Sequence, residues 1–284
     1  MLVFVAFFLA ACEVEYIAEP PTAGGESPSG SVPSADGTAI HYQETGTGPV
    51  ALLFVHCWSC DGGFWKRQVG HFSRTNRVVT LDLAGHGASG KGRTTYTMAA
   101  FAEDVVAVVE RLRLDRVILI GHSMGGPVVV EAARHRRLDR LVKGVVTVDS
   151  FETGFKWPEL NRINAFLAPF RLNFRQNTLD MVKKMFPSGS DPVLVTQISE
   201  KMAGAPQEVA LSAMEQLLMW RVKEGEKSVA SLRVPLFHIN ADPERRAIPG
   251  SARVRLIPGA GHFLPQEVPD RFNETLEAVL RDIH

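Results

Sequence analysis

The chain has 284 residues, of which 45% are hydrophobic and 22% charged, so it can bury a full globular core. Basic and acidic residues balance at 31 each, which gives no reason to expect nucleic acid or an acidic membrane surface as a partner. The sequence has no phosphate-binding loop, no internal repeat and no zinc-type Cys/His spacing. We therefore expect neither a metal nor a cofactor.

The first segment, residues 1–12, resembles an export signal that ends at a lipid-attachment cysteine. Residues 2–11 form an uninterrupted apolar run that is too short to span a bilayer, since a transmembrane helix needs about 20 residues. Leu9 to Cys12 resembles a bacterial lipobox, although no Lys or Arg precedes the run. We expect an exported protein, either membrane-anchored through lipidated Cys12 or periplasmic or extracellular. The alternative is a partly buried N-terminal segment.

The next segment, residues 13–35, is expected to be a flexible linker. Pro, Gly, Ser and Ala dominate this part of the chain, and large apolar side chains are scarce. Such a composition cannot bury enough surface to become ordered. The folded region is therefore expected to begin near Asp36.

Strand and helix patterns alternate from residue 36 to residue 150. Thr97 is a suitable N-cap, because apolar residues follow it with the period of an amphipathic helix. This alternation predicts an α/β fold with a mainly parallel, doubly wound sheet. Buried strands are predicted at 50–55, 77–81, 117–120 and 145–148, with an edge strand at 38–43.

The pattern changes between residues 151 and 230, where helical periods predominate. We expect a helical cap that covers one face of the sheet. The α/β core is then expected to comprise residues 36–150 and 231–284, with a closing helix that begins at Pro269. The predicted cap helices cover 159–168, 173–185, 191–203 and 206–220, and the returning strands cover 236–240 and 253–257.

Residues 117–125 carry the clearest chemical signal. The apolar strand at 117–120 runs into Gly121-His122-Ser123-Met124-Gly125, and a helical pattern follows. A strand, a sharp turn and a helix around G-x-S-x-G are what a nucleophile elbow requires. In so tight a turn, side chains at Gly121 and Gly125 would collide with neighbouring backbone. Ser123 is therefore the candidate nucleophile.

Four motifs in order give the chain its resemblance to a known family. They are Phe54-Val55-His56, the segment at 82–89 (DLAGHGAS), the elbow, and Gly261-His262-Phe263. With them, residues 36–284 resemble the α/β-hydrolase-fold superfamily, and in particular its esterase- and lipase-like serine hydrolases. The resemblance implies an α/β-hydrolase fold with a helical cap insertion, and it says little about the substrate.

The resemblance also implies a catalytic triad. His262 stands at the family position of the base that takes the proton from Ser123. Asp242 is the favoured acid, because it follows the first strand after the cap and satisfies the order Ser, Asp, His; Glu244 is a neighbouring carboxylate. Asp149, at the end of an earlier strand, matches an acid position that some relatives use. It is kept as the alternative.

An oxyanion hole is expected from two backbone amides, those of Met124 and Trp58. The glycine usual in relatives before the second amide is replaced here by Cys57. We place His56, Cys57 and His122 beside the substrate pocket.

The pair Cys57 and Cys60 has C-x-x-C spacing. Two semi-buried thiols are favoured, and a disulfide, which would stiffen the oxyanion loop, is the alternative. The expected function is hydrolysis of a small-molecule carboxylic ester through an acyl-enzyme. The alternatives are hydrolysis of a lactone, thioester or carbon–carbon bond, or perhydrolysis, on the same fold. A non-catalytic ligand-binding protein is less favoured, because candidates for all three triad positions are present.

Overall fold

The predicted α/β fold with a mainly parallel sheet is confirmed by the computed structural model, which describes residues 28–150, 160–241 and 253–283. Within these residues, eight strands form one sheet in the order β1-β2-β4-β3-β5-β6-β7-β8. The pairs β1–β2 and β2–β4 are antiparallel and all other pairs are parallel. The strands are β1 (Ser29–Pro33), β2 (Ala39–Thr45), β3 (Ala51–Val55), β4 (Arg77–Leu81), β5 (Val117–His122), β6 (Val142–Val148), β7 (Leu236–Asn240) and β8 (Arg253–Leu256).

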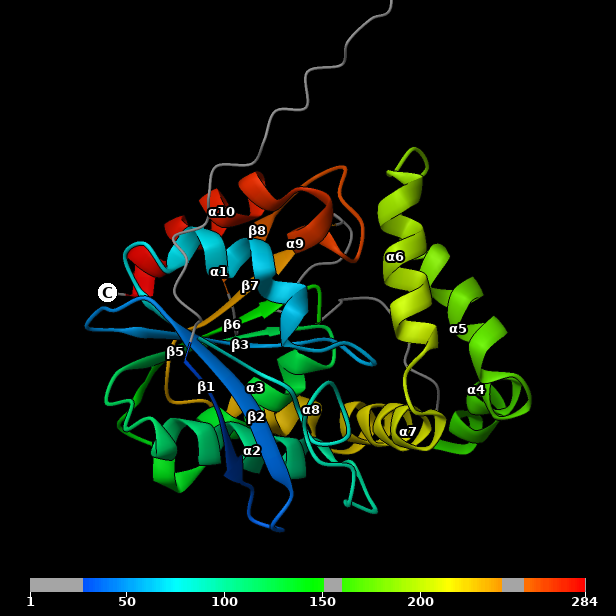
Figure 1. Cartoon of the computed structure of the whole chain (residues 1–284), viewed down its shortest axis with the longest axis horizontal. Coiled ribbons are helices and arrows are strands. Elements are labelled where there is room, and N and C mark those ends of the chain that lie inside the picture. Colours follow the sequence, from blue (N-terminus) through cyan, green and yellow to red (C-terminus); the bar gives the residue numbers. More distant parts are fainter. Residues whose placement is uncertain (1–27, 151–159, 242–252, 284) are drawn as a thin grey trace, which may run out of the picture.

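Helices cover both faces of the sheet (Figure 1), which explains the continuous apolar runs in its central strands. Every residue of β3 and of β5 is buried. The helices α1 (Lys66–Phe72), α9 (Leu264–Glu267) and α10 (Pro269–Ile283) lie on one side, and α2 (Met98–Arg111), α3 (Gly125–Ala133) and α8 (Gly225–Ala230) lie on the other. Two short 3₁₀ turns, η1 (Gly62–Trp65) and η2 (Arg136–Leu138), complete this part. Thr97 caps α2 as predicted, since its hydroxyl accepts from the amide of Ala100 at 3.0 Å.

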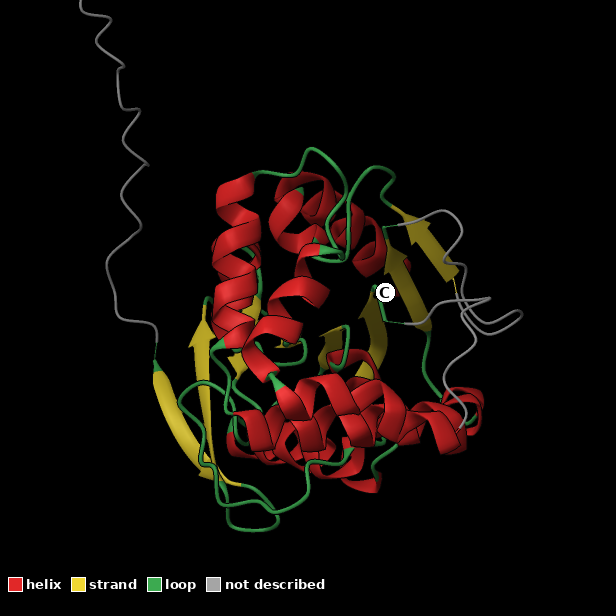
Figure 2. Ribbon diagram, turned by 90° about the vertical axis from the view of Figure 1, so that its right-hand side faces the viewer, coloured by secondary structure: helices red, strands yellow, loops and turns green. Residues whose placement is uncertain are grey.

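The remaining helices lie between β6 and β7 in the chain. They are α4 (Leu160–Leu172), α5 (Phe174–Lys183), α6 (Pro192–Ala203) and α7 (Gln207–Lys223). Figure 2 shows them from their own side, in front of the strands. We call α4 to α7 and the turns that join them the helical segment.

The structure corrects two details at the N-terminal end. Residues 29–33, which were assigned to the flexible linker, form β1 and pair with β2. Helix α1 was missed altogether. The signal segment, Cys12 and the linker as far as residue 27 lie outside the described residues, so export and lipid attachment stay predictions. Among the described residues, no helix combines the length and apolarity needed to cross a membrane.

Candidate active site

Ser123 lies at the tip of the turn between β5 and α3, with backbone φ of +54°. This left-handed conformation is uncommon for a residue other than glycine and is typical of a strained functional turn. An added Cβ on Gly121 would lie 2.1 Å from the carbonyl oxygen of Gly125, and one on Gly125 would lie 2.6 Å from that of Val55. Both glycines of the motif are therefore required by close backbone approach, as their spacing indicates.

The tip of the turn is fixed to the neighbouring strand. The amide of Ser123 donates to the carbonyl oxygen of Val148 at 2.9 Å, and the hydroxyl of Ser150 donates to the carbonyl oxygen of Ser123. The nucleophile candidate is thus held by the end of β6 as well as by its own turn. The role of Ser150 was not anticipated from the sequence.

The residues at the end of β6 also reach the histidine of the last loop. Nδ1 of His262 lies 2.7 Å from Oδ2 of Asp149, whose side chain is fully buried. The amide of Ala241 donates to the other carboxylate oxygen at 3.2 Å. If Nδ1 donates its proton to Asp149, Nε2 carries the lone pair and can act as a base.

Of the two candidate acids, Asp149 lies within the described residues and Asp242 does not. Asp149, the alternative acid, is the carboxylate in contact with His262, and its φ of +44° marks a second left-handed position in the site. Asp242, the favoured acid, and its neighbour Glu244 lie outside the described residues.

The loop that carries His262 is held by a carboxylate that the sequence did not single out. Glu267 accepts from the amides on both sides of the histidine, that of Gly261 at 3.1 Å and that of Phe263 at 3.0 Å. Burial raises the pKa of Glu267. The amide of His262 itself donates to the carbonyl oxygen of Met185, in the helical segment, at 3.0 Å. Both the core and the helical segment therefore fix this loop.

Two buried histidines brace the same region. Nε2 of His122 lies 2.8 Å from the carbonyl oxygen of His262. Burial lowers the pKa of His122 to about 3. Nδ1 of His56 lies 2.8 Å from the carbonyl oxygen of Cys57, and its Nε2 accepts from the amide of Leu83. Burial also lowers the pKa of His56.

The three residues that were placed beside the substrate pocket, His56, Cys57 and His122, are each exposed by 1% or less. They offer a substrate almost no surface. His56 uses both ring nitrogens, and His122 its Nε2, on backbone groups, so their contribution here is to fix loops.

The two amides expected to hold an oxyanion are available for that task. Within the described part of the chain, neither the amide of Met124 nor that of Trp58 donates to a protein acceptor. Met124 is the N-cap of α3, where the partial positive charge of a helix N-terminus favours an anion.

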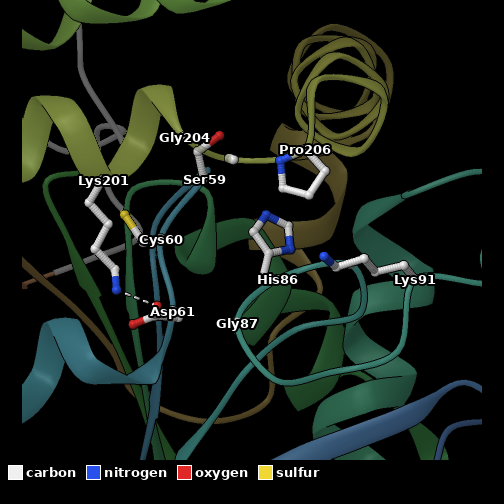
Figure 3. Close-up of a pocket in the computed structure, with 11 residues that line it drawn as sticks. Ser59, Cys60, Asp61, His86, Gly87, Lys91, Lys201, Gly204 and Pro206 are labelled. Carbon is white, nitrogen blue, oxygen red and sulfur yellow. Dashed lines mark ion pairs between the residues drawn. The ribbon is translucent and has the colours of Figure 1, made fainter.

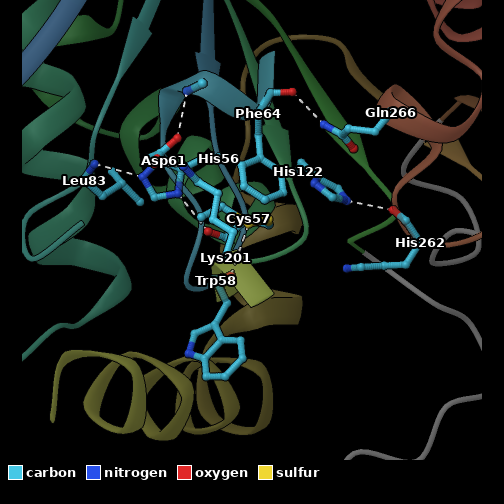
Figure 4. Close-up of a disulfide and its surroundings, with 12 residues drawn as sticks. His56, Cys57, Trp58, Asp61, Phe64, Leu83, His122, Lys201, His262 and Gln266 are labelled. Atoms are coloured by element: carbon cyan, nitrogen blue, oxygen red, sulfur yellow. Dashed lines mark hydrogen bonds and ion pairs between the residues drawn. A yellow bond between two sulfur atoms is a disulfide. The ribbon is translucent and has the colours of Figure 1, made fainter. Parts of the chain in front are cut away.

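The loop that carries Trp58 is closed by a disulfide between Cys57 and Cys60. Of the two states that the C-x-x-C spacing left open, the structure has the disulfide, and the preference for free thiols was wrong. The indole of Trp58 points away from the loop toward α7 (Figure 4), where its N–H donates to the carbonyl oxygen of Ala210 at 2.7 Å. Its ring also packs edge-on against Phe174 of α5.

No cluster of three or more His, Cys, Asp or Glu side chains suited to a metal ion occurs among residues 28–150, 160–241 and 253–283. The chemistry available from the described side chains is that of a hydroxyl, an imidazole and a buried carboxylate, with free amides beside them. Those groups are suited to nucleophilic catalysis.

Comparison with known proteins agrees with this arrangement. The model of the alpha/beta hydrolase family matches residues 52–275. A dihydrolipoyllysine-residue acetyltransferase component of an acetoin cleaving system from Pseudomonas putida is 25% identical, over 95% of this chain and 74% of that protein. A thermophilic esterase from Thermogutta terrifontis superposes with a TM-score of 0.77 at 23% identity, and the match covers 91% of this chain and all of the esterase. Est816, described as an N-acyl homoserine lactone degrading enzyme, superposes with a TM-score of 0.73 at 25% identity, over 88% of this chain and 99% of that one.

The chain belongs to the alpha/beta hydrolase family, because the family model spans most of its length. The resemblance inferred from the four motifs is thereby confirmed, and so is the prediction that the chain is an enzyme.

Proposed function

We propose that this enzyme hydrolyses carboxylic esters through an acyl-enzyme, with Ser123 as the nucleophile, His262 as the base and Asp149 as the acid. The observation that carries the proposal is the 2.7 Å contact between His262 Nδ1 and Asp149 Oδ2 beside an elbow that holds Ser123 in a left-handed conformation.

The reaction proceeds in two halves. Oγ of Ser123 attacks the ester carbonyl while Nε2 of His262 takes the hydroxyl proton, and buried Asp149 stabilises the imidazolium that results. The amides of Met124 and Trp58 stabilise the oxyanion of the tetrahedral intermediate. His262 then passes the proton to the departing alcohol, and water attacks the acyl-serine by the same steps to release the acid and restore Ser123.

The choice of Asp149 over Asp242 reverses the ranking made from motif position. It is supported by the fully buried position of the Asp149 carboxylate and by its contact with His262. A buried acid keeps the imidazole in the tautomer that leaves Nε2 free for proton transfer.

The test is a burst assay with p-nitrophenyl acetate, butyrate and octanoate on the full chain. Ser123→Ala is expected to abolish both burst and turnover. Asp149→Asn is expected to lower kcat by about 10⁴-fold, because the wrong tautomer is then stabilised, whereas Asp242→Asn, the matched control, changes kcat by less than about twofold. The order of the three rates measures the depth of the acyl site.

Two outcomes would change the assignment. A larger loss in Asp242→Asn than in Asp149→Asn transfers the role of the acid to Asp242. Turnover that persists in Ser123→Ala rejects the serine mechanism.

Lactone opening is a second candidate, favoured by the similarity to Est816, which is described as an N-acyl homoserine lactone degrading enzyme. A lactone is a cyclic ester, so the same groups perform the same steps and the alcohol stays attached to the product. Titration of the acid released from an N-acyl homoserine lactone distinguishes the two. A kcat/KM for the lactone well above that for every p-nitrophenyl ester makes lactone hydrolysis the better description.

A further inference from the structure

We propose that the Cys57–Cys60 disulfide is a thiol–disulfide exchange site, open to small anionic thiols through a cavity beside it, and that its reduction slows catalysis. The exchange reaction does not depend on the function proposed above. Its effect on catalysis rests on the function proposed above, because Trp58 lies between the two cysteines and its amide is an expected oxyanion donor.

The cavity has a volume of about 280 Å³ and lies where three segments meet (Figure 3). The loop after β3 contributes Ser59 to Asp61, the loop after β4 contributes Gly85 to Gly87, and the helical segment contributes Lys201 and Gly204 to Pro206. Because β3 lies between β4 and β5 in the sheet, the disulfide loop separates this cavity from the elbow after β5. Ser123, Asp149 and His262 are absent from its lining.

In the described structure, one cysteine of the pair lines the cavity. Cys60 lines it and Cys57 does not, and both residues are otherwise buried, at 3% and 1% exposure. An attacking thiolate therefore reaches Cys60. Exchange is directional here, because attack on Cys60 makes Cys57 the leaving group.

The polar groups around the cavity suit an anionic thiol. Lys91 lines the cavity and is exposed. Among the described residues, it forms no ion pair with an acidic side chain. Lys201 adds a second ammonium, paired with Asp61 at 2.6 Å. Positive charge raises the local concentration of anions and favours attack by a thiolate.

The reaction needs an external reductant, a dithiol or two equivalents of a monothiol. The thiolate of the reductant bonds to Sγ of Cys60, the Cys57–Cys60 bond breaks, and the electron pair leaves on Cys57, which takes a proton from solvent. A second thiolate then attacks the reductant sulfur of the mixed disulfide and releases Cys60 as a thiol. Two electrons enter the protein, and the reductant becomes a disulfide.

Reduction removes a restraint from the loop that carries Trp58. Ser59 has φ of +55°, a conformation that costs a serine about 1 kcal/mol and that the closed four-residue ring helps to impose. Without the bond Ser59 can return to negative φ. That change turns the Trp58–Ser59 peptide plane, and the loop then relaxes at the adjoining Cys57–Trp58 peptide, which moves the Trp58 amide out of line with the oxyanion.

The experiment uses the full chain with Cys12→Ser, so that every thiol detected comes from the pair. The protein is treated under native conditions with dithiothreitol, desalted without oxygen, and divided for alkylation with iodoacetamide and for hydrolysis of p-nitrophenyl butyrate. We expect two alkylated cysteines, a kcat about tenfold lower with KM changed by less than about twofold, and recovery on reoxidation. In Cys12→Ser with Cys57→Ala and Cys60→Ala, kcat is expected to be low with and without the reductant.

Access is tested with two small monothiols, mercaptoacetate and 2-mercaptoethanol, compared per unit of thiolate. We expect mercaptoacetate to react several times faster, and Lys91→Gln to remove that preference. Lys227→Gln, on the distant helix α8, is the matched control and is expected to retain it. Equal rates for both thiols in the unsubstituted chain overturn the role of the cavity.

The exchange site, its link to the oxyanion hole and the proposed function each fail through a different result. If no cysteine is alkylated without denaturant, the exchange site is rejected. If both are alkylated and kcat is unchanged, the link to the oxyanion hole is rejected. If no ester is hydrolysed in either redox state, the proposed function fails, while the alkylation rates still decide the exchange site.

Discussion

The elbow after β5 and the loops that surround it reach their positions by different means. The elbow depends on close approach of backbone at glycines of fixed spacing: Gly121 lies against the backbone of Gly125, and Gly125 lies against the backbone of Val55 at the end of β3. The loops after β3 and β8 are fixed by partners far away in the sequence. Trp58 is held by Ala210, and His262 by Asp149.

The difference teaches where a sequence is informative. Local crowding requires glycine at defined spacing, and that requirement can be recognised in a short motif. A loop held by distant side chains shows no such pattern, because its partners are known only once the chain has folded. The following substitutions test this contrast, from the largest expected effect to the smallest.

Gly121→Ala is expected to have the largest effect. Its new Cβ would lie 2.1 Å from the carbonyl oxygen of Gly125, so the turn has to open. We expect the free energy of unfolding to fall by about 3 kcal/mol or more and ester hydrolysis to be lost. Urea denaturation and the burst assay measure both. The control is Gly70→Ala on exposed α1, where a Cβ meets nothing within 4 Å and stability should rise by up to about 1 kcal/mol.

The buried histidines that brace the loops make stability depend on pH. The pKa of His122 is lowered to about 3 by burial, and that of His56 is also lowered. Each stays neutral in the folded state, while in the unfolded state it takes up a proton below its ordinary pKa of 6.5. The contribution of His122 is therefore complete above pH 6.5 and is lost, at about 1.4 kcal/mol per pH unit, as the pH falls toward its folded pKa of about 3; that of His56 changes in the same direction.

Urea denaturation at pH 7.5, 6, 5 and 4.5 measures this loss. In His122→Asn, the slope of the unfolding free energy against pH is expected to decrease by the contribution of one proton. An unchanged profile in that variant would mean that His122 has the same pKa in the folded and unfolded states.

Glu267→Gln tests the carboxylate that holds the His262 loop. A carboxylate accepts from the amides of Gly261 and Phe263 with one oxygen each, whereas glutamine has a single oxygen and turns an NH₂ group toward the other amide. We expect kcat to fall by about tenfold with KM nearly unchanged, corresponding to about 1.4 kcal/mol of transition-state stabilisation. Glu274→Gln, exposed on α10, is the control. Equal kinetics in the two variants would leave Glu267 without a positioning role.

Trp58→Phe is expected to have the smallest effect. It keeps an aromatic ring beside Phe174 and removes only the N–H that binds the carbonyl oxygen of Ala210. The loss of one buried hydrogen bond is expected to lower the free energy of unfolding by about 1 kcal/mol, as thermal or urea unfolding would detect. A much larger fall in kcat than in stability would mean that this hydrogen bond also sets the position of the Trp58 amide.

Much of the fold was open to prediction, because the central strands β3 and β5 contain continuous apolar runs and α2 has both a cap and a clear apolar face. Strand β1 was not, since its sequence SGSVP is small and polar and resembles a linker. It is ordered by pairing with β2, which is a tertiary effect. Helix α1 escaped notice because seven residues are too few for a periodic pattern to stand out.

Within the site, Ser123 and His262 were recognisable from motifs, while the groups that support them were not. The contact of Asp149 with His262 joins positions 113 residues apart, and motif position favoured Asp242. Glu267 acts on two backbone amides, which carry no sequence signature. The redox state of Cys57 and Cys60 depends on loop geometry, which the C-x-x-C spacing leaves undecided.

The place where the helical segment joins the sheet has a consequence for protein engineering. The segment leaves after β6 and returns at β7, and these strands are direct neighbours, with Val148 opposite Ile239. Because β6 and β7 are parallel, the chain leaves at the carboxyl end of β6 and re-enters at the amino end of β7, so a replacement has to keep α8 and span the height of the sheet. The N-terminal junction has to follow Ser150, which binds the elbow. A replacement also has to provide the two carbonyls that Met185 and Ala210 now present to the core, so donor segments are best selected for those two contacts and not for their length.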